Sequence, residues 1–240
     1  QRDGLSLTPT TRGSRLQCVY QRLQAQATPD GLWLESTEPE RGALRLVSTA
    51  VGRDAAQPGN DAGLEVLSLG QVGEFLNLPP ALPREGVLTV ADDRVRFARP
   101  GLMEEYSVSV DGIRQDFLIA DRPAGTSEVC VELSLTGARA EAMVQGVKLV
   151  LDGSGRELAY SRLRVTDAAG QELPARFVVV AGTRRATGSV HRHVHLFHVV
   201  ECAGRMGHEK AAEPGHARRA RNQHRTVLGR TVGQVEQRHH

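Results

Sequence analysis

The chain has 240 residues, of which 40% are hydrophobic and 24% charged, enough to bury a core in one large or two small domains. No run of about 18 apolar residues occurs, so the sequence predicts no transmembrane helix. The chain begins at Gln1 without an initiating Met or a charged and apolar leader, and we expect a processed protein or a fragment.

Charge and histidine content divide the chain near Val180. Residues 1–180 carry 19 Lys and Arg against 24 Asp and Glu and no histidine, whereas residues 181–240 carry 11 against 4 and all 9 histidines. The net charge therefore changes from −5 to +7. We predict three segments: a β-rich N-terminal segment with long loops at 1–86, an antiparallel β domain at 87–180, and a His- and Arg-rich tail at 181–240.

The sequence pattern of the N-terminal segment predicts strands separated by loops. Apolar and polar residues alternate within 15–27, and the turn Pro29-Asp30-Gly31 leads into a further apolar run. Trp33 has no aromatic neighbours that would make a carbohydrate-stacking platform, so we expect it in the core or at a strand edge. The segments 52–63 and 78–86 are rich in Gly, Pro and Asp and are expected to be linkers or long loops.

The region 104–120 contains the clearest structural unit. Apolar and polar residues alternate up to Asp111-Gly112, a dipeptide typical of a two-residue type I′ hairpin because both positions need positive φ. A slip of one residue would turn the apolar face to water. The predicted partners are Val110 with Ile113, Val108 with Gln115 and Tyr106 with Phe117.

The same alternation recurs on both sides of this hairpin. It covers 87–97, 129–136, 147–165 and 175–180, and its phase changes between Tyr160 and Leu163, which predicts a bulge. Strands spaced about 8–12 residues apart and joined by tight turns predict a mainly β fold, an antiparallel sandwich or meander, with a poorly ordered basic C-terminal tail. The residues expected to be buried are Tyr106, Val108, Val110, Ile113, Phe117, Val131, Leu133, Leu149 and Tyr160.

Few residues of the first 180 are candidates for chemistry. The absence of histidine there removes Ser-His-Asp and Cys-His mechanisms, and Glu104 and Glu105 should point to opposite faces of one strand. Cys18, Cys130 and Cys202 form no metal-ligand pattern and are interpreted as buried apolar residues, with a Cys18–Cys130 disulfide as the alternative. No catalytic residue and no cofactor is predicted.

The tail holds the candidate metal ligands. His191, His193 and His195 alternate, so on a strand they share one face and present imidazole nitrogens to a transition metal. The competing interpretations are that residues 181–240 result from out-of-frame translation of a GC-rich coding sequence, or form a genuine disordered basic tail with weak, nonspecific anion binding. Any strand over 190–200 is expected to be a local addition at a sheet edge.

Two sequence segments resemble segments of known proteins. The run from Glu104 to Phe117, EEYSVSVDGIRQDF, and the run from Glu157 to Asp167, ELAYSRLRVTD, resemble a β-rich region near the N-terminus of large secreted bacterial proteins. In those proteins the region precedes arrays of SBBP-type, FG-GAP-like or propeller-like repeats. The resemblance covers roughly residues 5–180 and transfers no functional residue.

The resemblance implies a non-enzymatic structural or adhesive accessory domain of a secreted or cell-surface bacterial protein, truncated before its repeats. The expected partners are further domains of the same polypeptide or cell-surface components. One alternative is a metal-binding protein or metal-dependent enzyme that uses the His191–His198 cluster. The other is a carbohydrate-binding sandwich, for which an aromatic content of 4% is unfavourable.

Overall fold

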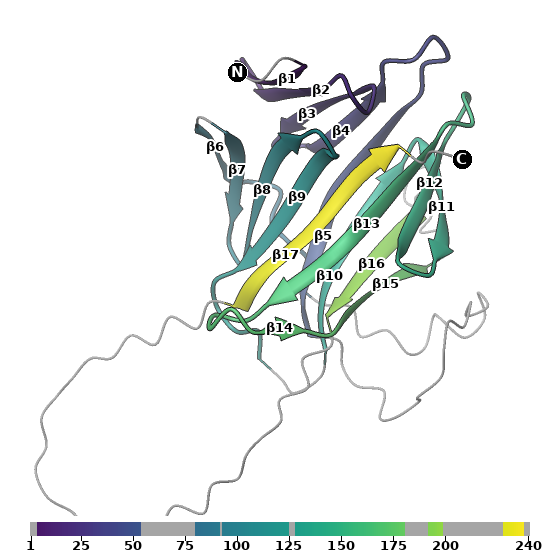
Figure 1. Ribbon diagram of the computed structural model, residues 1–240. Helices are drawn as coiled ribbons and strands as arrows, with labels where there is room; N and C mark the ends of the chain where they lie inside the picture. The colour runs from purple at the N-terminus through teal and green to yellow at the C-terminus, as the bar shows by residue number, and fades with distance from the viewer. Residues whose placement is uncertain are drawn as a thin grey trace, which may run out of the picture.

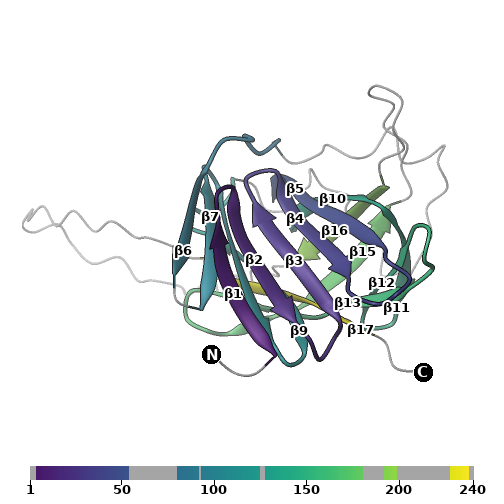
Figure 2. The ribbon, with the colours of Figure 1, turned by 90° about the horizontal axis from the view of Figure 1, so that it is seen from above.

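The computed structural model describes residues 4–53, 80–91, 93–124, 128–180, 192–198 and 228–237, the last two ranges by their backbone only. These residues form seventeen strands in two antiparallel sheets that pack face to face (Figures 1 and 2). The mainly β, antiparallel fold predicted from the alternating pattern is confirmed. The described residues contain no helix of the length and apolar character that crossing a membrane requires.

Each sheet is assembled from strands that lie far apart in the sequence. Sheet A has the order β1 (Leu5–Thr10), β2 (Gly13–Cys18), β3 (Leu23–Thr28), β4 (Gly31–Ser36), β5 (Ala43–Arg53), β10 (Val129–Thr136), β16 (Arg192–His198) and β15 (Ala175–Val180). Sheet B has the order β11 (Ala138–Met143), β12 (Gly146–Leu151), β13 (Glu157–Thr166), β17 (Leu228–Gln237), β9 (Gly112–Ile119), β8 (Leu102–Ser109), β7 (Arg94–Arg99) and β6 (Val87–Ala91). The short β14 (Glu172–Leu173) pairs with β13.

One hydrophobic core lies between the two sheets. It joins residues of β2–β5 to residues of β7–β13, so strands from 1–53 and from 87–180 share the same interior. Of the residues expected to be buried, seven are less than 5% exposed: Tyr106, Ile113, Phe117, Val131, Leu133, Leu149 and Tyr160. Val108 is only partly buried, and Val110 is 47% exposed, so the prediction for Val110 is wrong.

The β8–β9 hairpin explains the exposure of Val110. Its loop consists of Val110 and Asp111, with Ser109 opposite Gly112, and only Gly112 has positive φ, at 126°. The type I′ turn predicted at Asp111-Gly112 is therefore wrong, and the register differs by two residues. Because side chains alternate with a period of two, this shift leaves the buried face unchanged. The observed partners are Val108 with Ile113, Tyr106 with Gln115 and Glu104 with Phe117.

The bulge predicted between Tyr160 and Leu163 is confirmed. The pairing of β13 with β17 changes register between Ser161 and Arg164, and Arg162 has φ of 58°. A non-glycine residue in this left-handed conformation is typical of a local break in strand geometry. The break lets Tyr160 and Val165 both reach the core from one strand.

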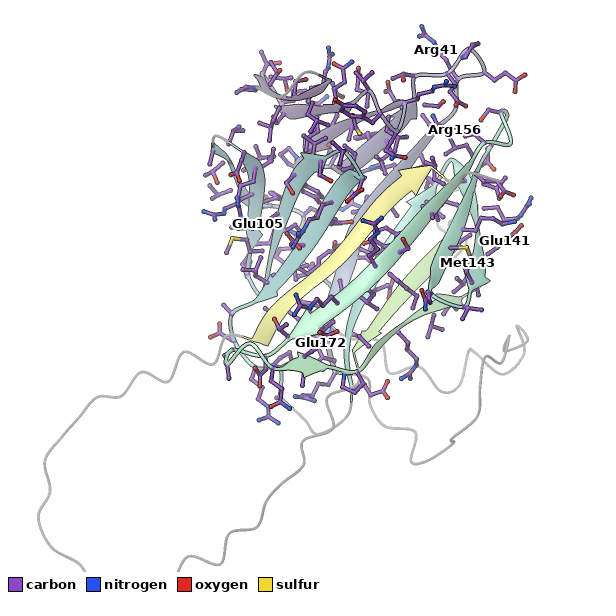
Figure 3. The ribbon with its side chains drawn as sticks, viewed as in Figure 1. Arg41, Glu105, Glu141, Met143, Arg156 and Glu172 are labelled. Atoms are coloured by element: carbon purple, nitrogen blue, oxygen red, sulfur yellow. The ribbon has the colours of Figure 1, made fainter. Side chains whose placement is uncertain are left out.

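A buried arginine joins the two sheets at one end of the sandwich. Arg156, which precedes β13, donates hydrogen bonds to the carbonyl oxygens of Gln21 (2.7 Å) and Arg22 (2.8 Å) and to Oγ of Ser36 (2.6 Å). Its side chain is 6% exposed and lies 3.5 Å from a carboxylate oxygen of Glu38. Figure 3 labels this residue at the end of the sandwich near the β4–β5 connection. The contacts tie sheet B to two turns of sheet A.

Two strands of the tail occupy interior positions. β16 pairs with β10 on one side and β15 on the other, and β17 pairs with β13 and β9. The prediction that a strand over 190–200 would be added at a sheet edge is therefore wrong. That prediction weighed the net charge of the tail, whereas Val194 and Leu196 are register partners of the buried Leu133 and Val131. The rest of 181–240 lies outside the described residues.

Candidate functional site

The outer face of sheet A carries a polar surface centred on one tryptophan. Four neighbouring strands place Arg15, Gln26, Trp33 and Arg45 opposite one another in a single row. A second row, two residues away along the strands, contains Gln17, Gln24 and Glu35. We call these seven residues the Trp33 platform. Figure 2 shows β2 to β5, which carry it, side by side in one layer.

Strand alternation explains why these side chains face outward. On β4, Leu32 and Leu34 are fully buried against the other sheet, so the intervening Trp33 must point to the opposite face. Trp33 is 39% exposed and lies on an interior strand of the sheet. The expectation that Trp33 packs in the core or marks a strand edge is wrong. Its polar neighbours Gln26 and Arg45 come from the adjacent strands.

Arg45 holds the tryptophan ring in place. Its guanidinium carbon lies 5.0 Å from the centroid of the Trp33 ring, the geometry of a cation–π contact. Nε of Arg45 donates to the carbonyl oxygen of Asp30 over 2.8 Å, and Nη2 donates to the same oxygen. Two hydrogen bonds to one backbone atom fix the guanidinium, so the aromatic surface beside it is ordered before any ligand arrives.

The outer face of sheet B differs in its charge balance. There Glu105 is paired with Arg94 (3.2 Å) and Arg96 (2.6 Å), and Asp116 is paired with Arg114 (3.0 Å). Figure 3 labels Glu105 on this sheet. Its buried carboxylates are thus matched by arginines on the same face. Among the described side chains of this face, these contacts stabilise the sheet and leave little unpaired charge for an external partner.

Among the residues that the structure describes, the arginines of the Trp33 platform have no carboxylate partner. In the described ranges, Arg15 makes no hydrogen bond or ion pair, and Arg45 bonds only to a carbonyl oxygen. The carboxylate of Asp30, at the turn before β4, is paired with Arg12 (3.0 Å). Within the platform Glu35 is the only carboxylate, and it lies in the second row. The first row therefore presents two positive charges around an aromatic ring.

The polar groups of the interior form hydrogen bonds that join the two sheets. Glu104, 2% exposed, accepts hydrogen bonds from Ser48 (2.9 Å) on sheet A and from Arg99 (2.5 Å), Tyr106 (2.6 Å) and Gln115 (2.9 Å) on sheet B. Burial and the Glu104 carboxylate raise the pKa of Tyr106 well above its ordinary value. A carboxylate with four donors and no access to water stabilises the fold and is poorly placed for acid–base chemistry.

The predicted metal ligands lie mostly beyond what the structure describes. His191 is outside the described residues, and His193 and His195 are the register partners of Ser134 and Glu132, with their side chains undescribed. Among the side chains that are described, no group of three or more His, Cys, Asp and Glu is placed to hold a metal ion. A site at His191, His193 and His195 stays a prediction.

The described cysteines are buried thiols. Cys18 and Cys130 are at most 1% exposed and form no disulfide with each other, so the interpretation as buried residues is confirmed for these two and the alternative Cys18–Cys130 disulfide is wrong. Sγ of Cys18 lies 3.2 Å from the carbonyl oxygen of Ser109, and burial raises the pKa of this thiol. Cys202 lies outside the described residues.

Sequence reasoning missed the Trp33 platform because its members come from four strands. The only signal was that the positions alternating with Leu16, Leu32 and Leu34 are glutamine, arginine and tryptophan, whose side chains offer planar binding groups. Comparisons with protein-family models, curated proteins and solved structures find no match.

Proposed function

We propose that the chain is a non-enzymatic, adhesive accessory domain of a secreted or cell-surface bacterial protein, and that it adheres through the Trp33 platform. The observation that carries this proposal is the ordered tryptophan on the outer face of sheet A, between Gln26 and Arg45 in one row. An aromatic ring with planar amide and guanidinium groups around it is suited to stacking and hydrogen bonding with a flat polar ligand.

Two further features support an adhesive module. Polar groups of the interior join the sheets to each other, with Ser48 bonded to Glu104 and Arg156 bonded to Ser36, which suits a rigid support for a binding surface. The resemblance of Glu104–Phe117 and Glu157–Asp167 to regions of large secreted bacterial proteins supports the surface location. Cell-surface components are the proposed partners.

The experiment is an adhesion assay with the purified full chain and washed, intact cells of the source bacterium. We expect the chain to bind, and the Trp33→Ala variant to lose most of its binding while keeping the same urea midpoint. Trp33→Phe serves as the matched control, because it keeps an aromatic face and should retain part of the binding. Equal binding by the original chain and Trp33→Ala would exclude the platform as the adhesive surface.

A localisation test accompanies the adhesion assay. Antibodies against the chain should label intact cells, or the chain should be recovered from the culture medium. Labelling that requires permeabilised cells would contradict a secreted or surface location. The two results are independent, because a surface protein whose platform is inert would pass this test and fail the adhesion assay.

A further inference from the structure

We infer that the ligand of the Trp33 platform is an acidic polysaccharide that carries uronate carboxylates; this inference rests on the proposed adhesive function. The first step is the arrangement of charge. Arg15 on β2 and Arg45 on β5 lie on the two sides of Trp33 in one row, with Gln26 between Arg15 and the ring. The row therefore places one stacking group, Trp33, between groups that bind anions or hydroxyls.

The second step is the length of the row. Strands β2 to β5 are consecutive neighbours in sheet A, and neighbouring strands lie about 4.8 Å apart, so the two arginines stand about 14 Å from each other across the sheet. A linear polysaccharide laid across the strands can place one ring on Trp33 and carboxylates of flanking units near Arg15 and Arg45. A compact ligand such as a free phosphate would reach only one of them.

The third step is the state of each arginine. Arg45 already donates Nε and Nη2 to Asp30 and contacts the Trp33 ring, so it is fixed in position. Arg15 is exposed, and in the part of the chain that the structure describes it has no partner. Guanidinium groups bind carboxylates through paired hydrogen bonds, which favours a uronate over a neutral sugar at these positions.

Glu35 sets the orientation of such a ligand. It is the one carboxylate of the platform, is exposed, and lies in the second row between Gln24 and Ala43. An anionic ligand is repelled from that row and attracted to the first, so the polymer should follow the line from Arg15 to Arg45. Removing the Glu35 charge should strengthen binding, which a purely apolar contact would not do.

The test measures binding of the full chain to polygalacturonate by affinity electrophoresis at neutral pH, with the same polymer after reduction of its carboxyl groups as the comparison. We expect retardation by polygalacturonate and much weaker retardation by the reduced polymer. Arg15→Gln should weaken binding to polygalacturonate about threefold, and Trp33→Ala about tenfold. Glu35→Gln should strengthen it about twofold.

Arg139→Gln is the matched control, because it removes one exposed arginine from β11, on the other sheet. It should leave binding unchanged, whereas an equal loss in Arg139→Gln and Arg15→Gln would mean that net charge alone drives retention. If Trp33→Ala shifts the urea midpoint, Trp33→Phe provides the comparison. Competition by single-stranded DNA with the same dependence on Arg15 would overturn the assignment to a polysaccharide.

The outcomes separate the ligand from the function. Trp33-dependent adhesion to cells without binding to polygalacturonate, or with equal binding to the reduced polymer, overturns the acidic ligand and keeps the adhesive function. Arg15- and Trp33-dependent binding to polygalacturonate without adhesion to cells supports the ligand class and overturns the adhesive function.

Discussion

Tyr160 on β13 donates its hydroxyl hydrogen to Oε1 of Gln115 on β9 over 3.2 Å, although β17 lies between these two strands in sheet B. Gln115 in turn donates to the Glu104 carboxylate, which also accepts the hydroxyl of Tyr106. The two tyrosines are thus bound at opposite ends of one buried network. The network joins both halves of sheet B and, through Ser48, reaches sheet A.

The two tyrosines should differ in what they contribute to stability. Tyr106→Phe removes a donor from a buried carboxylate and should lower the free energy of unfolding by about 2 kcal/mol. Tyr160→Phe removes a bond between neutral groups and should cost about 1 kcal/mol. Urea denaturation of both variants measures the difference, and a larger loss for Tyr160→Phe would contradict the ordering of the network.

Stability should fall at alkaline pH because of the same residues. Burial is the main cause that raises the pKa of Tyr106 and of Tyr160 above the ordinary tyrosine value. A raised pKa means that the folded chain holds these protons more tightly than the unfolded chain. Their contribution is therefore complete below about pH 10 and is lost as the pH rises further.

Ultraviolet absorbance of tyrosinate follows this loss in a Tyr20→Phe chain, where Tyr106 and Tyr160 are the remaining tyrosines. Both should ionise together with unfolding, in one transition that circular dichroism also reports. Ionisation of either tyrosine in a chain that is still folded would show that water reaches the network.

The β8–β9 loop gives a test of register. Gly112→Val should destabilise the fold by about 1–3 kcal/mol, because φ of 126° is strained for a β-branched residue. Val110→Asn should cost less than about 0.5 kcal/mol, since Val110 lies exposed in the loop. Thermal unfolding of the two variants measures both losses of stability and thereby tests the register. A large loss for Val110→Asn would restore the register predicted from Asp111-Gly112.

The sequence predicted which face of each strand is buried better than it predicted which residues pair across the strands. Alternation of apolar residues identified the buried side of β8 and β9 correctly even though the register was two residues off, because both registers bury Tyr106 and Phe117. The choice between them depends on φ at Gly112 and on contacts such as that between Val110 and Gln21, whose Nε2 donates to the Val110 carbonyl oxygen. Those contacts come from distant parts of the chain.

The Trp33 platform could not be predicted from local sequence patterns either, because its residues come from different strands. The exposure of Trp33 follows from the burial of Leu32 and Leu34, which alternation does indicate. Its partners Gln26 and Arg45 become neighbours only when β3, β4 and β5 pair in one register. A platform built across strands has no spacing that a single sequence reveals.

The tail should be needed for the fold. A chain that ends at residue 227 lacks β17, so β9 and β13 each lose one of their two neighbouring strands in the middle of sheet B. We expect this chain to lose cooperative unfolding in urea, because backbone groups of two interior strands would be unpaired. A chain shortened only by residues 238–240 is the control. Unchanged cooperativity and midpoint after the longer deletion would contradict the interior position of β17.

The most direct measurement of the Trp33 platform uses the fact that Trp33 is the only tryptophan in the chain. Its fluorescence therefore reports on the platform alone, and acrylamide should quench it readily because the ring is 39% exposed. We predict that saturating polygalacturonate shifts the emission and protects Trp33 from acrylamide, and that the reduced polymer protects it far less. Quenching that is the same with and without ligand, under conditions where the chain is bound to its partner, would contradict the Trp33 platform as the binding surface.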